Sequence, residues 1–381
     1  MSSPLGIVVI VFLALLGLSF AIGGEEPPAP AAAPVALIAE RVEALRGRRF
    51  KTVPRAVTVS PERAREEGLA DLDRGYPAAA RTADETLYAM LDLVPEGTDL
   101  REISASLFGE QVAGYYDPRT GRLRVVEGTG GNRFLDEITL AHELTHALED
   151  QVFTLDTDAA EDSGDAGYAY RALAEGTATA LMLEYASRHF GAEEALGGLL
   201  SGSLTISSST PLPPFVQAGF TWPYLGGQTF VQELYASAGR TWRLVDVALE
   251  ARPPASTEQV LHPEKWLRVE QPLDVVAPRS PGPGWTRRTG GTFGEWQTGQ
   301  LVGTEAAAGW GGDRYALWTR GRERALAMRW RWDSPADAGE FEGALRRVEW
   351  PEGVESTIRH RGGEVRLGLA TAVSIADLLV R

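Results

Sequence analysis

The chain has 381 residues, no cysteine and a formal net charge of −15, and 44% of its residues are hydrophobic. The lack of cysteine excludes disulfides, thiolate zinc sites, iron–sulfur clusters and a cysteine nucleophile. The acidic balance argues against a nucleic-acid partner, because phosphate recognition needs a basic face. The length allows two domains, and any metal must be held by His, Asp or Glu.

An apolar segment, residues 5–22, opens the chain and is interrupted only by Gly and Ser. As a helix it would reach about 27 Å, the lower limit for a membrane span. We therefore predict that residues 1–24 are a membrane anchor or a cleaved signal peptide. Residues 25–34 are rich in Pro and Ala and are predicted to be a linker. The folded body would then lie outside the cytoplasm, held at the cell membrane by a single span or released as a secreted or periplasmic protein.

The body shows alternating helical and strand patterns from residue 35 onward. Its first half is predicted to form a helix at 35–46, a strand at 55–60, helices at 61–73 and 77–93, a hairpin of strands at 111–116 and 122–126, and helices at 133–152 and 166–189. Asn132 is the predicted N-cap of the helix at 133–152. Helices are expected again at 226–238 and 241–250. A Pro/Gly-rich boundary at 276–284 precedes two strands within 311–333, a helix at 334–348 and a strand at 363–370. The pattern predicts an α+β fold with domains at 35–275 and 284–381.

One motif carries metal chemistry: residues 142–146 read H-E-L-T-H, in the middle of a predicted helix. Residues four apart lie on one helix face, so His142 and His146 can reach one Zn²⁺ ion. Glu143 lies about 100° further round the helix, beside the open position of the metal. A metal lowers the pKa of its bound water, and a carboxylate there can accept the proton. The alternative is that both histidines are ordinary residues of an amphipathic helix.

A catalytic zinc site needs a third protein ligand, and Glu175 is the best candidate. It is an acid in an otherwise apolar helix face, followed by small residues that allow another helix to approach. A buried acid is costly unless it is paired or binds a metal, although Glu175 could also be a satisfied carboxylate of the core or surface. Glu149, Asp150 and Glu184 are competing ligands. We interpret Glu149 and Asp150 more simply as partners that orient an imidazole.

These residues resemble a known family. The sequence H-E-L-T-H-A-L-E-D-Q at 142–151, with E-G-T-A-T at 175–179, is similar to the gluzincin, thermolysin-like zinc metallopeptidases. Residues 256–265 and 309–313 also resemble bacterial envelope gluzincins. The resemblance covers roughly residues 35–270 and implies a zincin-like catalytic domain, helix-rich with a small sheet.

The resemblance implies a role for each site residue. His142, His146 and Glu175 would bind zinc, and Glu143 would activate the water. An edge strand above the zinc would pair with the substrate backbone, and here residues 109–116 are the candidate. Thr179 stands where thermolysin-like members often carry an Asp, so the partner of a histidine must come from elsewhere, with Asp150 as one possibility.

A peptidase of this type also needs a donor for the oxyanion, typically His or Tyr. His262 is our prediction because it lies in a motif-like setting before Pro263; the alternative is an ordinary turn histidine. Weaker candidates, which we interpret rather as packing residues, are Tyr115, Tyr116, Tyr224 and Tyr235.

The C-terminal part is rich in tryptophan and arginine: seven of the ten tryptophans lie beyond residue 280. We interpret the tryptophans as the core and rim of a small sheet, and the arginines at 320–331 as a solvated strand face rather than an anion site. This α+β domain would cover the cleft, dock a substrate or set location.

The sequence therefore predicts a zinc-dependent endopeptidase of the cell envelope, acting on a peptide or protein substrate, with no nucleic-acid partner. The oligomeric state stays open. The rival is a catalytically silent zincin fold that keeps zinc as a structural element and serves as an envelope binding or assembly protein. A third possibility is that the motif is accidental, in which case no metal would bind tightly.

Overall fold

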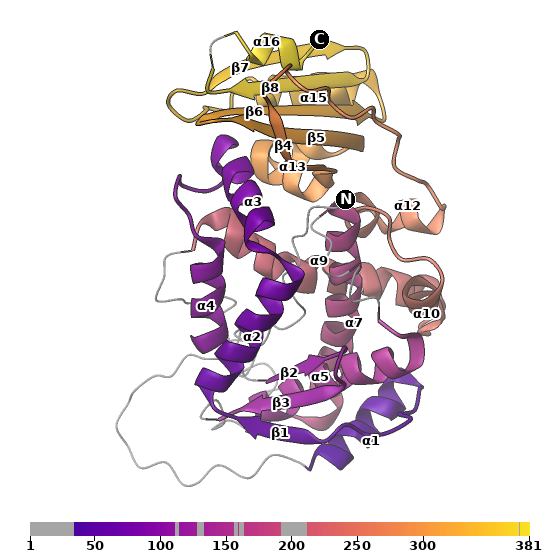
Figure 1. Cartoon of the computed structure of the whole chain (residues 1–381). Helices are drawn as coiled ribbons and strands as arrows, with labels where there is room; N and C mark the ends of the chain where they lie inside the picture. Colours follow the sequence, from indigo (N-terminus) through magenta and orange to yellow (C-terminus); the bar gives the residue numbers. More distant parts are fainter. Residues whose placement is uncertain are drawn as a thin grey trace.

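The computed structural model of the protein describes residues 34–110, 114–127, 133–155, 159, 164–191, 212–372 and 374–381. It is 53% helical and 17% strand and contains two sheets, which confirms the predicted α+β class. Figure 1 shows the smaller sheet at one end of the molecule, the larger sheet at the other, and helices between them. The predicted anchor, residues 1–24, lies outside the described residues, and none of the helices within them is long and apolar enough to cross a membrane.

The first part of the chain forms four helices and a three-stranded sheet. These elements are α1 (Val35–Arg46), β1 (Ala56–Val59), α2 (Pro61–Gly75), α3 (Ala78–Met90), α4 (Leu100–Glu110), β2 (Gly114–Asp117) and β3 (Arg122–Val126). The strand order is β1-β3-β2, with β1 parallel and β2 antiparallel to β3, so β2 is an edge strand. The candidate edge strand at 109–116 is shorter than predicted: Gly109 and Glu110 belong to α4, and residues 111–113 lie outside the described residues.

Three long helices form the centre of the molecule: α5 (Arg133–Phe153), α7 (Asp165–His189) and α9 (Pro214–Ser237). Helix α7 packs against both of the others. Helices α5 and α7 match their predicted ranges within one residue, whereas α9 begins twelve residues before the predicted 226. Asn132, the predicted N-cap of α5, lies outside the described residues. Three shorter helices follow: α10 (Arg243–Glu250), α11 (Thr257–Leu261) and α12 (Pro263–Leu267).

The C-terminal part is a five-stranded antiparallel sheet with short helices. Its elements are β4 (Thr286–Gly291), α13 (Gly294–Val302), α14 (Thr304–Ala307), β5 (Trp310–Arg320), β6 (Glu323–Trp332), α15 (Pro335–Leu345), β7 (Glu355–Arg361), β8 (Glu364–Ala370) and α16 (Ala376–Leu379). The strand order is β4-β5-β6-β8-β7. The strands at β5, β6 and β8 and the helix α15 were predicted. Residues 268–285, which include the predicted boundary at 276–284, contain neither helix nor strand.

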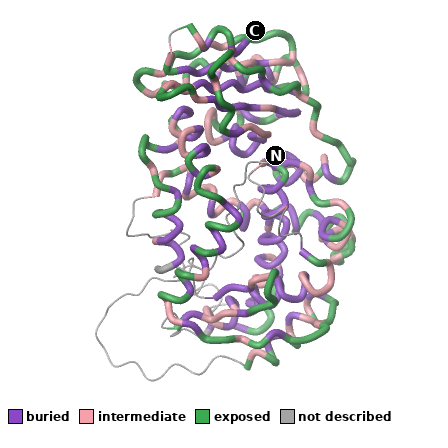
Figure 2. Tube along the Cα trace, in the orientation of Figure 1, coloured by how far each residue is buried: buried purple, intermediate pink, exposed green. Residues whose placement is uncertain are grey.

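One face of the larger sheet packs against helices from the first part of the chain. On β6, Leu326, Met328 and Trp330 belong to a hydrophobic cluster that also contains Leu87 of α3 and Phe108 of α4. The buried purple segments in Figure 2 include both the larger sheet and the helices beneath it. The C-terminal part therefore shares one core with the rest of the chain, and its buried tryptophans, among them Trp310, Trp330 and Trp332, form that core as predicted.

Candidate metal centre

Helices α5 and α7 bring three of the predicted metal ligands together. The Nε2 atoms of His142 and His146 lie 3.1 Å apart. Oε2 of Glu175 lies 3.2 Å from the first nitrogen and 3.3 Å from the second. All three residues are buried, and they form a group that could hold a metal ion.

The dimensions of this group fit zinc. Bonds of about 2.0–2.1 Å to a tetrahedral zinc ion place neighbouring ligand atoms about 3.3 Å apart. The three separations, 3.1, 3.2 and 3.3 Å, are close to the edges of one face of such a tetrahedron. Two imidazoles and a carboxylate are also the ligand types that zinc accepts. The residues therefore fit a zinc ion with three protein ligands and one position left for a small molecule.

The electrostatics of the group favour a cation. Burial raises the pKa of Glu175, but His146 and His142 outweigh this effect and hold the value at about 2. Burial lowers the pKa of His146, yet the neighbouring Glu175 and Glu143 carboxylates raise it to about 9. Burial instead lowers the pKa of His142. The two carboxylates therefore make the site attractive to a cation, and a metal ion that binds there must displace the proton of His146.

Glu143 lies beside the ligands and is held by the smaller sheet. Its Oε2 accepts a hydrogen bond of 2.8 Å from the backbone N–H of Tyr116, on the edge strand β2. Burial raises the pKa of Glu143 to about 8, although the charge of His146 lowers it. The carboxylate therefore has a fixed orientation and an increased affinity for a proton, two properties that a general base requires.

Tyr224, one of the tyrosine candidates, reaches the site from α9. Its ring stacks 6.0 Å from that of His142, and its hydroxyl donates a hydrogen bond to the Glu175 carboxylate. The sequence pattern did not favour Tyr224 over the other tyrosines, because the helix predicted in this region began only at residue 226.

His262 does not lie with the metal ligands. Its Nε2 is 2.9 Å from a carboxylate oxygen of Glu295 on α13. The preceding helix α11 is tied through Thr257 to Asp165, the first residue of α7. Asp165 is ten residues from Glu175, which corresponds to about 15 Å along the helix. The structure therefore does not support His262 as the oxyanion donor, because its imidazole is engaged with Glu295 at the other end of α7.

The other tyrosine candidates have structural partners. The Tyr115 hydroxyl donates to Glu67 at 2.6 Å, and the Tyr116 hydroxyl donates to Asp150 at 2.8 Å. The Tyr235 ring packs 5.0 Å from that of Trp242. None of these three contacts involves a metal ligand.

The competing ligands also have other partners. Glu149 forms a buried ion pair of 2.8 Å with Arg46, and Glu184 pairs with Arg188. The expectation that Glu149 or Asp150 orients an imidazole through a hydrogen bond is not met either. Among the described residues, Nδ1 of His142 and Nδ1 of His146 have no hydrogen-bond partner. Arg46 is 103 residues from Glu149, so no local pattern could have revealed this pair.

A second group of acids already contains a cation. Glu258, Glu270 and Asp333 lie close enough to hold a metal ion. However, Nζ of Lys265 lies 2.6 Å from Glu258, 2.9 Å from Glu270 and 2.6 Å from Asp333. The ammonium group neutralises the cluster and links α11 and α12 to the end of β6. We therefore assign this cluster a structural role.

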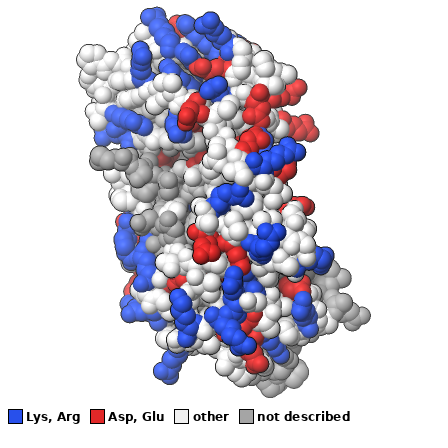
Figure 3. Space-filling model, turned by 90° about the vertical axis from the view of Figure 1, so that its right-hand side faces the viewer, with Lys and Arg blue, Asp and Glu red and all other residues white. Residues whose placement is uncertain are grey.

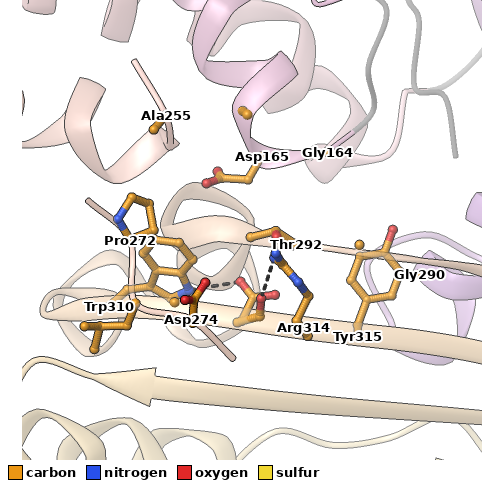
Figure 4. Close-up of a pocket in the computed structure, with 15 residues that line it drawn as sticks. Gly164, Asp165, Ala255, Pro272, Asp274, Gly290, Thr292, Trp310, Arg314 and Tyr315 are labelled. Atoms are coloured by element: carbon orange, nitrogen blue, oxygen red, sulfur yellow. Dashed lines mark hydrogen bonds between the residues drawn. The ribbon is translucent and has the colours of Figure 1, made fainter. Parts of the chain in front are cut away.

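A cavity of about 440 Å³ lies where the start of α7 meets the larger sheet (Figure 4). Asp313 of β5 accepts bonds of 2.7 Å from the backbone N–H groups of Phe293 and Gly294 and one of 3.0 Å from the Trp310 indole. Asp165 accepts from Thr257 through Oδ1, while its buried Oδ2 has no partner among the described residues. Asp165 is linked to the C-terminal part through Thr257, whose hydroxyl also accepts a hydrogen bond of 3.1 Å from the backbone N–H of Trp296 on α13.

Comparison with known proteins covers only the C-terminal part. A family described as a domain of unknown function (DUF8575) matches residues 284–375, which hold the larger sheet. Neither the curated proteins nor the solved structures contain a match.

Proposed function

We propose that the protein is a zinc-dependent endopeptidase of the gluzincin type, with zinc held by His142, His146 and Glu175. The observation that carries the proposal is the spacing of three ligand atoms at 3.1, 3.2 and 3.3 Å. Glu143 stands beside them with one oxygen fixed by a backbone N–H. A zincin-like catalytic domain is the architecture that this arrangement favours.

The zinc ligands and Glu143 would have separate roles in peptide hydrolysis. Bound zinc would supply a Lewis acid and lower the pKa of a water molecule. Glu143 would take a proton from the attacking water and deliver it to the amine that leaves. The Tyr116 N–H holds Oε2 of Glu143, so the second carboxylate oxygen is the one that receives the proton.

A peptide is the substrate class that suits this surface. Strand β2 is the edge of its sheet and lies against α5. The unpaired edge of a strand binds an extended peptide through main-chain hydrogen bonds, which demand little of the side chains. Gly114, Tyr115 and Tyr116 of β2 are buried and the Tyr116 N–H is bonded to Glu143, so a peptide would pair with the remaining main-chain groups of this edge. A peptide aligned along β2 would lie next to Glu143, since that carboxylate is bonded to the same strand.

The rival function, a silent envelope binding protein with structural zinc, accounts less well for the site. Structural zinc sites are usually closed by four protein ligands. Three ligands lie together here, and the fourth direction is not filled by another His, Asp or Glu of the described residues. Burial of the Glu143 carboxylate also lowers the stability of the folded protein, and a purely structural zinc site does not require this residue.

The proposal is tested by measuring zinc content and peptide hydrolysis together. We expect about one zinc per chain, and we expect Glu143→Gln to keep the zinc but lose at least about 100-fold in kcat. Glu175→Ala should lose the zinc. The matched control is Glu184→Gln, a carboxamide change at a half-exposed position of α7, which should retain activity. Zinc without any hydrolysis by the wild type would favour the silent protein, and no retained zinc would refute the metal centre.

A further inference from the structure

Four arginines form a row across the larger sheet. The strand register places Arg314 of β5 opposite Arg329 of β6, Arg329 opposite Arg366 of β8, and Arg366 opposite Arg359 of β7. Like charges directly opposite each other on neighbouring strands destabilise a sheet. A negatively charged ligand between these guanidinium groups would reduce their mutual repulsion.

The row lies on the face directed away from the shared core. Along β6, Leu326, Met328 and Trp330 point into that core, whereas Ala325 and Ala327 pack under α16. Successive side chains of a strand alternate between faces, so Arg329 and Arg331 share the outer face with the two alanines. Basic side chains gather at this end of the molecule in Figure 3.

Some of these arginines border a pocket of about 480 Å³. It is lined by apolar residues, four arginines and two acids, and the charged ones are Arg329, Arg331, Arg361, Arg366, Asp274 and Glu364. Among the four arginines that line the pocket, only Arg366 forms an ion pair within the described part of the chain, and its partner is Glu364. The lining therefore carries an excess of two positive charges.

Arg329 provides the second observation that points to a ligand. It is only 8% exposed, and its Nε has no hydrogen-bond partner among the described residues. Nη2 of Arg329 donates to the backbone oxygen of Arg381 at 3.4 Å, and Nη1 of Arg366 donates to the same oxygen at 3.0 Å. A buried guanidinium with an unused donor is costly, and because this Nε is itself inaccessible, an anion in the adjoining pocket would stabilise Arg329 through its charge rather than by accepting from Nε. Of the arginines at 320–331, which we interpreted as a solvated strand face, Arg320, Arg322 and Arg331 are exposed as expected, and Arg329 is the buried exception.

We propose that this pocket binds a phosphate group, either of a small phosphorylated molecule or of a phospholipid headgroup. Guanidinium groups converge on it from three strands, β6, β7 and β8. A tetrahedral dianion offers oxygens in several directions, whereas a carboxylate offers two in one plane. Two excess positive charges also match a phosphate dianion, and guanidinium forks bind phosphate bidentately. The site is independent of the metal centre.

The test titrates inorganic phosphate into the full chain by calorimetry. Arg331 and Arg361 are exposed, so Arg331→Gln and Arg361→Gln should fold normally, which their urea midpoints check. Each should weaken phosphate binding about tenfold, the loss expected for one charge-assisted contact. The matched control is Arg322→Gln, an exposed residue in the turn before β6. It is seven residues from Arg329, or about 23 Å along the strand, and should bind phosphate as the wild type does.

Vesicles distinguish the two sources of phosphate. The protein is sedimented with vesicles of phosphatidylcholine alone and with vesicles that also contain phosphatidic acid. The first measures any binding by the apolar N-terminal segment, and the difference between the two measures binding to the phosphate headgroup. Binding that requires phosphatidic acid and is reduced in Arg331→Gln and Arg361→Gln assigns the site to a headgroup. Saturable binding of free phosphate alone assigns it to a small molecule. The proposal is overturned if neither ligand shows binding that depends on these arginines, or if Arg322→Gln loses as much.

Discussion

The Glu175 carboxylate is contacted by two imidazoles and by the hydroxyl of Tyr224. A carboxylate that accepts a hydrogen bond while it binds a metal is held in one orientation, and partners of this kind commonly tune metal affinity. Tyr224 is therefore a positioning residue in our interpretation. The same hydroxyl is also the donor nearest to the ligands among the tyrosine candidates, so its two possible roles must be separated by experiment.

We predict that Tyr224→Phe weakens zinc binding by about fivefold to tenfold, since one hydrogen bond to a charged group is lost. Competition with a chromogenic chelator measures the change. Tyr235→Phe on the same helix is the control, and its zinc affinity should not change. Unchanged zinc affinity combined with a lower kcat at constant KM would instead make Tyr224 the oxyanion donor.

Residue chemistry alone predicted part of this site and missed the rest. The spacing of His142, Glu143 and His146 follows from helix geometry, and the cost of burying Glu175 pointed to a metal ligand. The placement of His262 could not be predicted in the same way. It depends on which end of α7 the helix α11 packs against, and that contact runs through Thr257 and Asp165, which are 92 residues apart.

At the scale of elements, helices α7 and α9 approach each other through glycine. A Cβ added at Gly227 would clash with the carbonyl oxygen of Ala172, and one added at Gly176 would clash with the backbone of Gly227. Gly176 directly follows Glu175. The close contact of the two helices thus fixes the height and direction at which Glu175 meets the two histidines.

We predict that Gly227→Ala destabilises the protein by about 1–3 kcal/mol, because the backbone carbonyl of Ala172 cannot move without shifting a helix. Urea unfolding measures this loss, and zinc affinity should fall with it. Gly339→Ala in α15 is the control, since a Cβ there meets no described atom within 4 Å and alanine favours a helix. Equal stability of the two variants would contradict the close packing of α7 and α9.

The elements differ in how well their sequence patterns predict them. Helices α5 and α7 have regular apolar spacing, so their ends were predicted closely. Helix α9 contains Pro223, Gly226 and Gly227, which individually disfavour a helix, and packing against α7 outweighs them. Strands β4 and β7 are the edges of their sheet and are largely polar or glycine-rich, so they lack the alternation that marks β5 and β6.

At the scale of the whole molecule, the C-terminal part is joined to the rest by a shared core and by buried carboxylates. Burial raises the pKa of Asp165 to about 8; Thr257 counteracts this effect, and the charges of Asp313 and Glu258 add to it. The folded protein therefore keeps a proton on Asp165 that the unfolded chain releases near pH 4. Folding favours proton binding between about pH 4 and pH 8, so the contribution of Asp165 to stability falls as the pH rises through this range.

We predict that Asp165→Asn removes this pH dependence, because asparagine keeps the oxygen that accepts from Thr257 but cannot ionise. The stability of the wild type relative to the variant should fall by at least about 1 kcal/mol between pH 5 and pH 8. Urea midpoints at the two pH values measure it. The exposed Asp377→Asn serves as the control and should follow the wild type. Parallel stability curves for the wild type and Asp165→Asn would show that Asp165 is already ionised at pH 5.

The ligands on α5 and α7 have a further consequence for a chain without cysteine. Glu175 follows His146 by 29 residues, so an ion bound to both would join distant points of the chain as a disulfide does in an oxidised protein. Unlike a disulfide, this cross-link is reversible, and its strength depends on the concentration of free metal. The lifetime of the folded protein would then follow the supply of free zinc, and a chelator would shorten it.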